Sequence, residues 1–398
     1  MGNYIFIYAC RMLGLRRVLT FFAVSGRILH GCPTNMTYMW NFGVYSLVCL
    51  MLQVLTGVFL AMFYVADVEW AFLSIEYVMR DVSWGWLIRY LHGNGASFFF
   101  LAVYLHVFRG LYYGSYTYPR EFVWLSGVIL LMVMVVTAFS GYILVWGQMS
   151  FWAATVITNL VTAVPLIGKD VVIWIWGGMS VGNAMLSRFY SLHYLLPFVL
   201  VGLVGVHVLL VQDVGSNGYL GLANVLVDDC SFYPYYVLRD FLGVLGFLLL
   251  LWFMVFFHPC ALGEFDNFVM ANALVTPLHI IPNWYLTPFF SVLRGIPDKL
   301  GGVVGLLGAI GVLGLVPYFF KCEVRSSVFR PLICVCFWCF VGCCLLLGFL
   351  GGCVVEKPFS WFMRGLTVFY FAYFLFLIPV LVMQEKRLWD NFWVNRLK

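Results

Sequence analysis

HGNGASFFFLAVYLH at residues 92–106 and HYLLPFVLVGLVGVH at residues 193–207 are two mostly apolar stretches that each begin and end with histidine. In both, the two histidines are 14 residues apart. An α-helix turns about 100° and rises about 1.5 Å per residue, so such residues lie on nearly the same face, about 21 Å apart. Two such helices side by side would form two layers of paired imidazoles.

Imidazoles at bilayer depth are rare and usually have a function. A single buried histidine is more often a packing residue, but the chain has only seven histidines, and four of them share this register. A metal ion without haem needs all its ligands within about 2 Å of one centre, which layers about 21 Å apart cannot supply. The two layers therefore indicate two haems, each held by two histidines.

The composition indicates a membrane protein with several spans, because 64% of the residues are apolar and only 10% are charged. Eight apolar runs are long enough to cross a bilayer. They lie near residues 40–64, 86–113, 122–146, 185–211, 234–257, 300–320, 331–353 and 361–383. We therefore expect an all-α membrane protein with eight transmembrane helices, the first four forming a bundle around the haems.

An even number of spans places both termini on one side of the membrane. That side carries 14 of the 22 lysines and arginines, so the positive-inside rule makes it the inner side. The second and fourth spans then run in the same direction. His92 and His193 would pair near the outer surface, and His106 and His207 near the inner one.

The first and third predicted spans carry glycine pairs with the same spacing of 14 residues: Gly43 with Gly57, and Gly127 with Gly141. Glycine lets a flat macrocycle approach the helix backbone, but it also allows close helix packing. The sequence leaves both interpretations open.

The rest of the chain divides around this bundle. Residues 1–39 form a basic arm at the inner surface, 40–215 the bundle, and 216–398 a second four-helix part. Segments 147–188 and 272–302, after the third and fifth spans, predict amphipathic helices on the outer surface. Nothing in the charge pattern indicates nucleic-acid binding.

Two motifs carry a family resemblance: GQMSFWAATVITNL at residues 147–160 and PNWY at residues 282–285. With the paired histidines, they make the chain from Trp40 onward resemble mitochondrial-type cytochrome b, the quinol-oxidising subunit of the cytochrome bc complex. The resemblance implies two non-covalent b-type haems, with the outer one at lower potential. It also implies that Arg89, Arg109 and Ser115 surround haem propionates, for which guanidinium groups suit carboxylates.

The resemblance further implies two quinone sites, with ubiquinol oxidised at the outer site and quinone reduced at the inner one, coupled to proton translocation in a Q cycle. The outer site would use Tyr142, Ala153, Pro282, Asn283, Trp284 and Tyr285. The inner site would use Gln212, Ser216, Asn217 and Asp240.

Three positions depart from the family pattern. Asn283 stands where the family has glutamate, and an amide cannot accept and release a proton near neutral pH. Gln212 replaces a quinone-contacting histidine, and Ala153 adds a methyl group where glycine is usual. These departures affect the proton routes and leave the haem assignment unchanged.

The resemblance implies a Rieske iron–sulfur protein, a membrane-anchored c-type cytochrome and other complex III subunits as partners, in a homodimeric complex surrounded by lipids. We expect the mitochondrial inner membrane, with both termini in the matrix; a bacterial plasma membrane is the alternative. Two other functions are compatible with parts of the pattern: a di-haem anchor of another quinone-linked dehydrogenase, and an eight-span transporter with histidine proton relays. An anchor has no need of residues 282–285, and a transporter would contain no reducible haem.

Overall fold

The computed structural model describes residues 31–221, 229–320 and 324–396, so most of the predicted N-terminal arm lies outside the described residues. Within these ranges, eight helical segments are long and apolar enough to cross a membrane, which confirms the predicted number. Their helices are α3 (Phe42–Ala61), α5 (Gly85–Tyr112), α6 (Glu121–Ile143), α9 (Asn183–Val214), α10 (Val237–Phe257), α12 and α13 (Lys299–Gly311 and Val316–Phe319), α14 (Pro331–Gly351), and α15 and α16 (Phe359–Ala372 and Ile378–Arg396).

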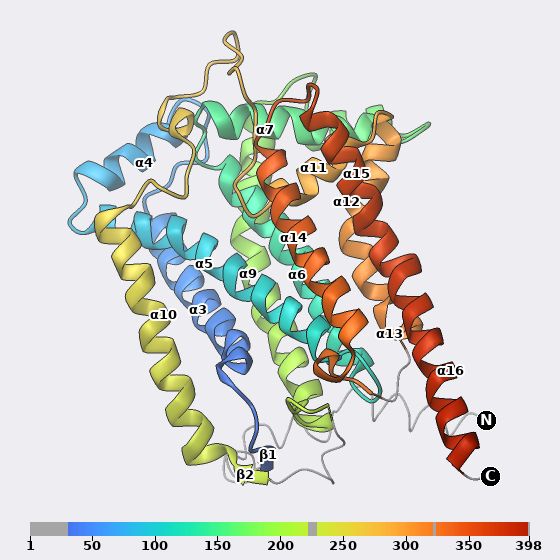
Figure 1. Cartoon of the computed structure of the whole chain (residues 1–398). Coiled ribbons are helices and arrows are strands. Elements are labelled where there is room, and N and C mark those ends of the chain that lie inside the picture. Colours follow the sequence, from blue (N-terminus) through green and yellow to red (C-terminus); the bar gives the residue numbers. More distant parts are fainter. Residues whose placement is uncertain (1–30, 222–228, 321–323, 397–398) are drawn as a thin grey trace, which may run out of the picture.

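Shorter helices gather at one end of the bundle (Figure 1). The predicted helices after the third span are α7 (Gln148–Asn159) and α8 (Gly168–Trp176), and the one after the fifth is α11 (Thr287–Gly295). Helix α11 is mostly buried against α12, α14 and α15, so its prediction as a surface helix is wrong. Helix α4 (Ala71–Arg80), after the first span, was not predicted. It is short, and its Glu76 and Arg80 form an i, i+4 ion pair at 2.6 Å that supports such a helix.

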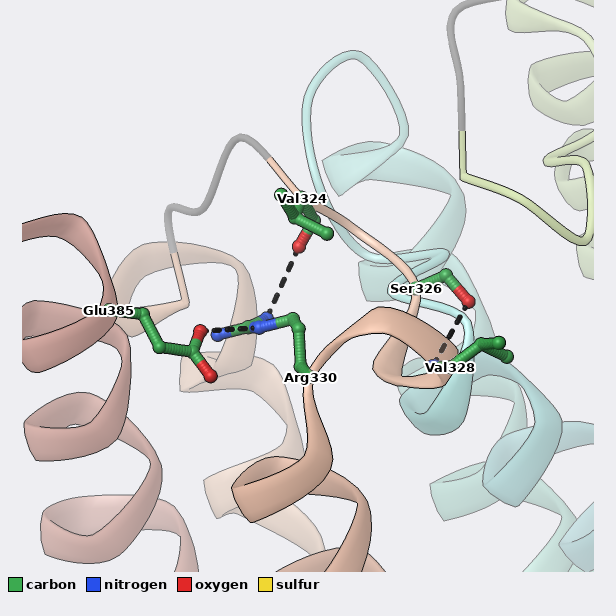
Figure 2. Close-up of polar contacts among 5 residues, drawn as sticks. All are labelled: Val324, Ser326, Val328, Arg330 and Glu385. Carbon is green, nitrogen blue, oxygen red and sulfur yellow. Dashed lines mark hydrogen bonds and ion pairs between the residues drawn. The ribbon is translucent and has the colours of Figure 1, made fainter. Parts of the chain in front are cut away.

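The opposite end of the bundle carries a small sheet, so the chain is not purely helical (Figure 1). Strand β1 (Gly31–Pro33) pairs antiparallel with β2 (Asp229–Ser231), with Cys32 opposite Cys230. At this end Arg330, just before α14, also pairs with Glu385 of α16 at 2.6 Å (Figure 2). These contacts join segments that are far apart in the sequence.

The first four spans enclose the histidines. Helix α3 packs against α5 and α9, and α6 packs against α9. A continuous apolar core joins these helices to the later spans, and it contains Leu50, Phe100, Leu131 and Leu200 from the bundle with Phe340 and Tyr370 from α14 and α15. Helix α10 lies apart from α14 and α15, packed against α3 and α5 (Figure 1).

Candidate functional site

The four histidines form two pairs between α5 and α9. The ring centres of His92 and His193 are 6.3 Å apart, and those of His106 and His207 are 6.4 Å apart. A metal–imidazole bond is about 2.0 Å long and the ring centre lies about 1.1 Å behind its nitrogen, so two imidazoles on one metal have centres about 6.3 Å apart. Each pair is therefore spaced to hold one iron atom between its rings.

Three of the histidines are fixed in the tautomer that binds metal through Nε2. The partners of Nδ1 are Thr56 Oγ1 for His92 (2.9 Å), the Thr137 carbonyl for His193 (2.8 Å) and Ser126 Oγ for His207 (2.8 Å). Both hydroxyls donate their own protons to backbone carbonyls of Leu52 and Val123, so they accept from the imidazoles. A proton on Nδ1 leaves the Nε2 lone pair for iron, and such contacts orient a metal ligand.

His106 differs, because its Nδ1 contacts the guanidinium of Arg109 at 3.0 Å. Arginine only donates, so this nitrogen must accept, which places the ring proton on Nε2. The Nε atom of Arg109 is buried and has no hydrogen-bond partner within the described ranges, and the guanidinium lies over the ring of Trp40. A haem propionate would satisfy Arg109 and release His106 to ligate iron, so these residues fit the group that the sequence implies.

The four glycines face the four histidines one to one. A Cβ atom would lie 3.2 Å from the His106 ring at Gly43 and 3.1 Å from His92 at Gly57. At Gly127 it would lie 3.5 Å from His207, and at Gly141 it would collide with His193. Close helix packing alone does not require this correspondence, so the arrangement favours the haem interpretation of the glycine spacing.

A cavity of about 560 Å³ surrounds the outer histidine pair. Arg89, Gly57 and Gly141 line it beside His92 and His193, and the same cavity reaches Tyr142, Asn283 and Tyr285. Its volume is within the range of about 300–1,000 Å³ that is typical of ligand pockets. One continuous space therefore connects the outer haem residues with part of the predicted quinol site.

Tyr285, in the part of the cavity predicted to bind quinol, is held in place by several contacts. Its ring stacks on Phe100 with centres 4.0 Å apart, its carbonyl accepts from Tyr104, and its hydroxyl accepts from Asn283 at 2.8 Å. Burial raises the pKa of Tyr285 to about 12, which keeps the phenol protonated near neutral pH. The Tyr142 hydroxyl is buried and has no partner among the described residues, so it is free to bind a ligand.

The other predicted outer-site residues lie elsewhere. Ala153 in α7 is 2% exposed and does not line the cavity, nor does Pro282. Trp284 lines a separate apolar cavity of about 420 Å³, and its indole nitrogen donates to Ser97 at 3.1 Å.

The predicted inner residues are only partly brought together. Asn217 is 3% exposed. Its side-chain Nδ2 donates to the Tyr113 carbonyl at 2.8 Å and to Ser115 Oγ at 3.4 Å, and its backbone carbonyl accepts from the Trp40 indole at 2.8 Å. Ser115, Asn217 and Arg109 thus lie around Trp40.

Gln212 is exposed near the end of α9, Ser216 contributes its carbonyl to Arg120, and Asp240 lies half-buried in the first turn of α10. The structure shows no hydrogen bond from Gln212 or Asp240 to Asn217 within the described ranges.

Three residues near the site are not indicated by the sequence pattern. Thr56 and Ser126 each precede one of the spaced glycines, a regularity that could have identified them. Asn41 is completely buried, its Nδ2 donates to the Arg239 carbonyl at 3.4 Å, and its Oδ1 has no partner in the described part of the chain. A single asparagine at the start of a span gave no comparable signal.

Comparison with known proteins identifies the family. Residues 28–215 match the family model "Cytochrome b/b6/petB", and residues 270–371 match "Cytochrome b(C-terminal)/b6/petD". The cytochrome b of Chondrus crispus is 51% identical over 354 residues, which is 89% of this chain and 93% of that protein. That of Rhodospirillum rubrum is 48% identical over 360 residues, 90% of this chain and 89% of that protein.

The fold comparison agrees. A chain of "Hyperthermophilic respiratory Complex III" is similar with a TM-score of 0.87 and 32% identity, covering 94% of this chain and 99% of that one. The match extends over both the histidine bundle and the later spans. The chain therefore belongs to the cytochrome b family, the haem-binding membrane subunit of respiratory complex III, which is a quinol–cytochrome c oxidoreductase.

Proposed function

We propose that this chain is the catalytic quinone-binding subunit of its complex and holds two non-covalent b-type haems. His92 and His193 would ligate the outer haem of lower potential, and His106 and His207 the inner haem of higher potential. The observation that carries this proposal is the ring spacing of 6.3 and 6.4 Å in two layers. When bound, the haems would carry electrons singly between the two sides of the membrane.

At the outer site, ubiquinol would occupy the part of the cavity between Tyr142, Asn283 and Tyr285. The unpartnered Tyr142 hydroxyl and the Asn283 amide can bind the quinol oxygens, and the stack of Tyr285 on Phe100 supplies a rigid apolar wall. Pro282 and Trp284 would hold segment 282–285 in place. Ala153 does not line the cavity and would affect it only through the packing of α7.

At the inner site, quinone would bind near Gln212, Ser216, Asn217 and Asp240. Asp240 would deliver protons, and the unpartnered oxygen of Asn217 marks a hydrogen-bonding position still open. Asn41 joins this proposal because its buried oxygen is also unpartnered, and its amide contacts the residue before Asp240.

The implied partners are a Rieske iron–sulfur protein, which takes one electron from each quinol, and a membrane-anchored c-type cytochrome, within a homodimeric complex. Many large apolar side chains of the spans are exposed, among them Leu249 (69%) and Phe349 (67%), and lipids and further subunits would cover them. We place the chain in the mitochondrial inner membrane with both termini in the matrix, supported by the excess of basic residues on that side.

The test is an optical redox titration of the purified complex, followed by quinol:cytochrome c activity. We expect two reducible b-type components with different potentials and quinol-dependent reduction of both. A single component, or haem that quinol cannot reduce, would overturn the proposal. Two haems in a complex without quinol:cytochrome c activity would favour a di-haem anchor of another dehydrogenase, and complete absence of haem would favour a transporter.

A further inference from the structure

Glu264 is a carboxylate on the wall of the outer cavity that the family resemblance did not identify. It lies just before the 3₁₀ turn Phe265–Phe268 and lines the same cavity as Tyr142, Asn283 and Tyr285. It is half-buried. The position that usually carries a carboxylate is occupied by Asn283, so Glu264 brings an acid to the site from another segment.

The segment after Glu264 is bonded to the corner between α6 and α7. Asn267 Oδ1 accepts from the Ser150 amide at 2.9 Å and the Val269 carbonyl from the Gln148 amide at 2.9 Å, while the Ala271 amide donates to the Trp146 carbonyl at 3.1 Å. Because Tyr142 lies in the last turn of α6, these hydrogen bonds hold the segment that follows Glu264 at the same corner. Glu264 is therefore followed by a segment that is anchored to the rest of the protein by hydrogen bonds.

The Glu264 carboxylate is also not engaged in an ion pair or a helix cap among the described residues. The cavity is lined by two carboxylates, Glu76 and Glu264, and Glu76 already pairs with Arg80 at 2.6 Å. Across the described ranges Glu264 forms no ion pair, and its side chain does not cap the turn that it precedes. Burial raises the pKa of Glu264 above its ordinary value, and the negative charge of Asp266 adds to this effect. A carboxylate of this kind is a better proton acceptor near neutral pH than an exposed one.

We propose that Glu264 accepts a proton from quinol at the outer site, in the role that an amide at position 283 cannot perform. The inference rests on the proposed function. When the quinol gives up two electrons, which the outer haem and the external iron–sulfur protein would accept, its two O–H bonds break. One proton forms a neutral Glu264 carboxyl group and the other leaves with the iron–sulfur protein. Asn283 and Tyr142 orient the quinol oxygen towards the acid.

The sign of the pH dependence follows from the groups around the acid. The charge of Asp266 raises the pKa of Glu264, and the cavity lined by Glu264 is also lined by Tyr142, Tyr285, the paired Glu76 and Arg80, and the cation Arg89. Only ionised Glu264 can accept a proton, so turnover should rise with pH as Glu264 deprotonates. Since its pKa is raised, this rise should occur above the range of an ordinary glutamate.

The experiment measures quinol-driven haem reduction and quinol:cytochrome c activity from acid to alkaline pH in the assembled complex. Glu264→Gln should reduce the rate at least tenfold and abolish the acid limb of the profile, because general-base contributions are about 10²-fold or more. Adding Asn283→Glu to that variant should restore the rate. Asp266→Asn is the matched control: it should keep the rate and move the acid limb to lower pH. The spectrum after chemical reduction verifies haem content in each variant.

A Glu264→Gln variant with the rate and pH profile of the parent would overturn the inference. If that variant loses haem, Glu264→Asp decides instead, since an aspartyl carboxyl titrates lower and the acid limb must move to lower pH. If the acid limb of the pH profile does not move in Glu264→Asp, the inference is also overturned. A parent complex whose haem is not reduced by quinol would contradict the proposed function itself, which separates the two failures.

Discussion

The outer and inner histidine layers have nearly the same distance between their two rings, 6.3 and 6.4 Å, but differ in the hydrogen bonds of the rings. In the outer layer, both Nδ1 atoms face acceptors, and a cavity of about 560 Å³ opens beside the rings. In the inner layer, His207 faces an acceptor but His106 faces the donor Arg109. The outer site is therefore organised by the fold, whereas the inner site must exchange one hydrogen bond when haem binds.

The difference shows how a repeated sequence pattern can give two sites of different character. The 14-residue spacing fixes the distance between layers, while hydrogen-bonding groups from α3 and α6, and Arg109 of α5 itself, fix which nitrogen of each ring carries the proton. The following predictions test this contrast, beginning with the largest effect.

The largest effect is expected from removing a histidine. Replacing His92 or His193 with alanine should eliminate the outer haem and leave the inner one, and replacing His106 or His207 should do the reverse. An iron between two imidazoles loses half its protein ligands in either case. A redox titration of the b-type absorbance should show one component in place of two. If His92→Ala and His106→Ala removed the same component, the two-layer arrangement would be wrong.

The next effect separates two glycines. A methyl group at Gly141 would collide with the His193 ring, whereas at Gly127 it would lie 3.5 Å from the His207 ring, an ordinary contact. Overpacking costs about 1–3 kcal/mol, which corresponds to roughly 5-fold to 150-fold weaker haem retention. Gly141→Ala should therefore lose outer haem on dilution in detergent, while Gly127→Ala retains inner haem. Equal retention in both would contradict the difference in space.

A smaller effect concerns the arginines. Arg109→Gln should lower the midpoint potential of the inner haem, because a nearby cation stabilises the form that has gained an electron. The shift should be on the order of tens of mV, since about 59 mV equals a tenfold change in a one-electron equilibrium. Arg89→Gln is the mirror variant and should lower only the outer potential. A change in the outer potential from Arg109→Gln would refute the assignment of this arginine to the inner layer.

The smallest functional effect should come from the pair in Figure 2, which lies away from the cavity. Arg330 is 5% exposed, so Glu385→Gln leaves a buried cation without its charged partner and should lower the free energy of unfolding by about 1–3 kcal/mol. Both haem potentials should remain unchanged. The double variant Arg330→Met with Glu385→Leu should regain most of the thermal stability, because no unpaired charge remains. A haem shift in either variant would show that the two regions are coupled.

Local geometry explains what could be read from the sequence. Helix periodicity depends only on the backbone, so the register of His92 with His106 and of Gly43 with Gly57 followed from counting residues. The eight spans followed from apolar length alone. Helix α4 and the strand pair of β1 and β2 were not predicted, because short elements are stabilised by contacts with their neighbours more than by their own sequence pattern.

What the sequence determined is thus the number of spans, the pairing of the histidines and the family to which the chain belongs. Only the tertiary structure decided which groups set the tautomers of His92 and His207, because Thr56 and Ser126 come from other helices than the rings that they accept from. The contact of Arg109 with His106 lies within α5, where a spacing of three residues allows it without specifying it. The same holds for Glu264, which reaches the outer cavity because hydrogen bonds between distant segments hold it there. Contacts between segments far apart in the chain depend on how loops close and side chains pack, and no local pattern encodes them.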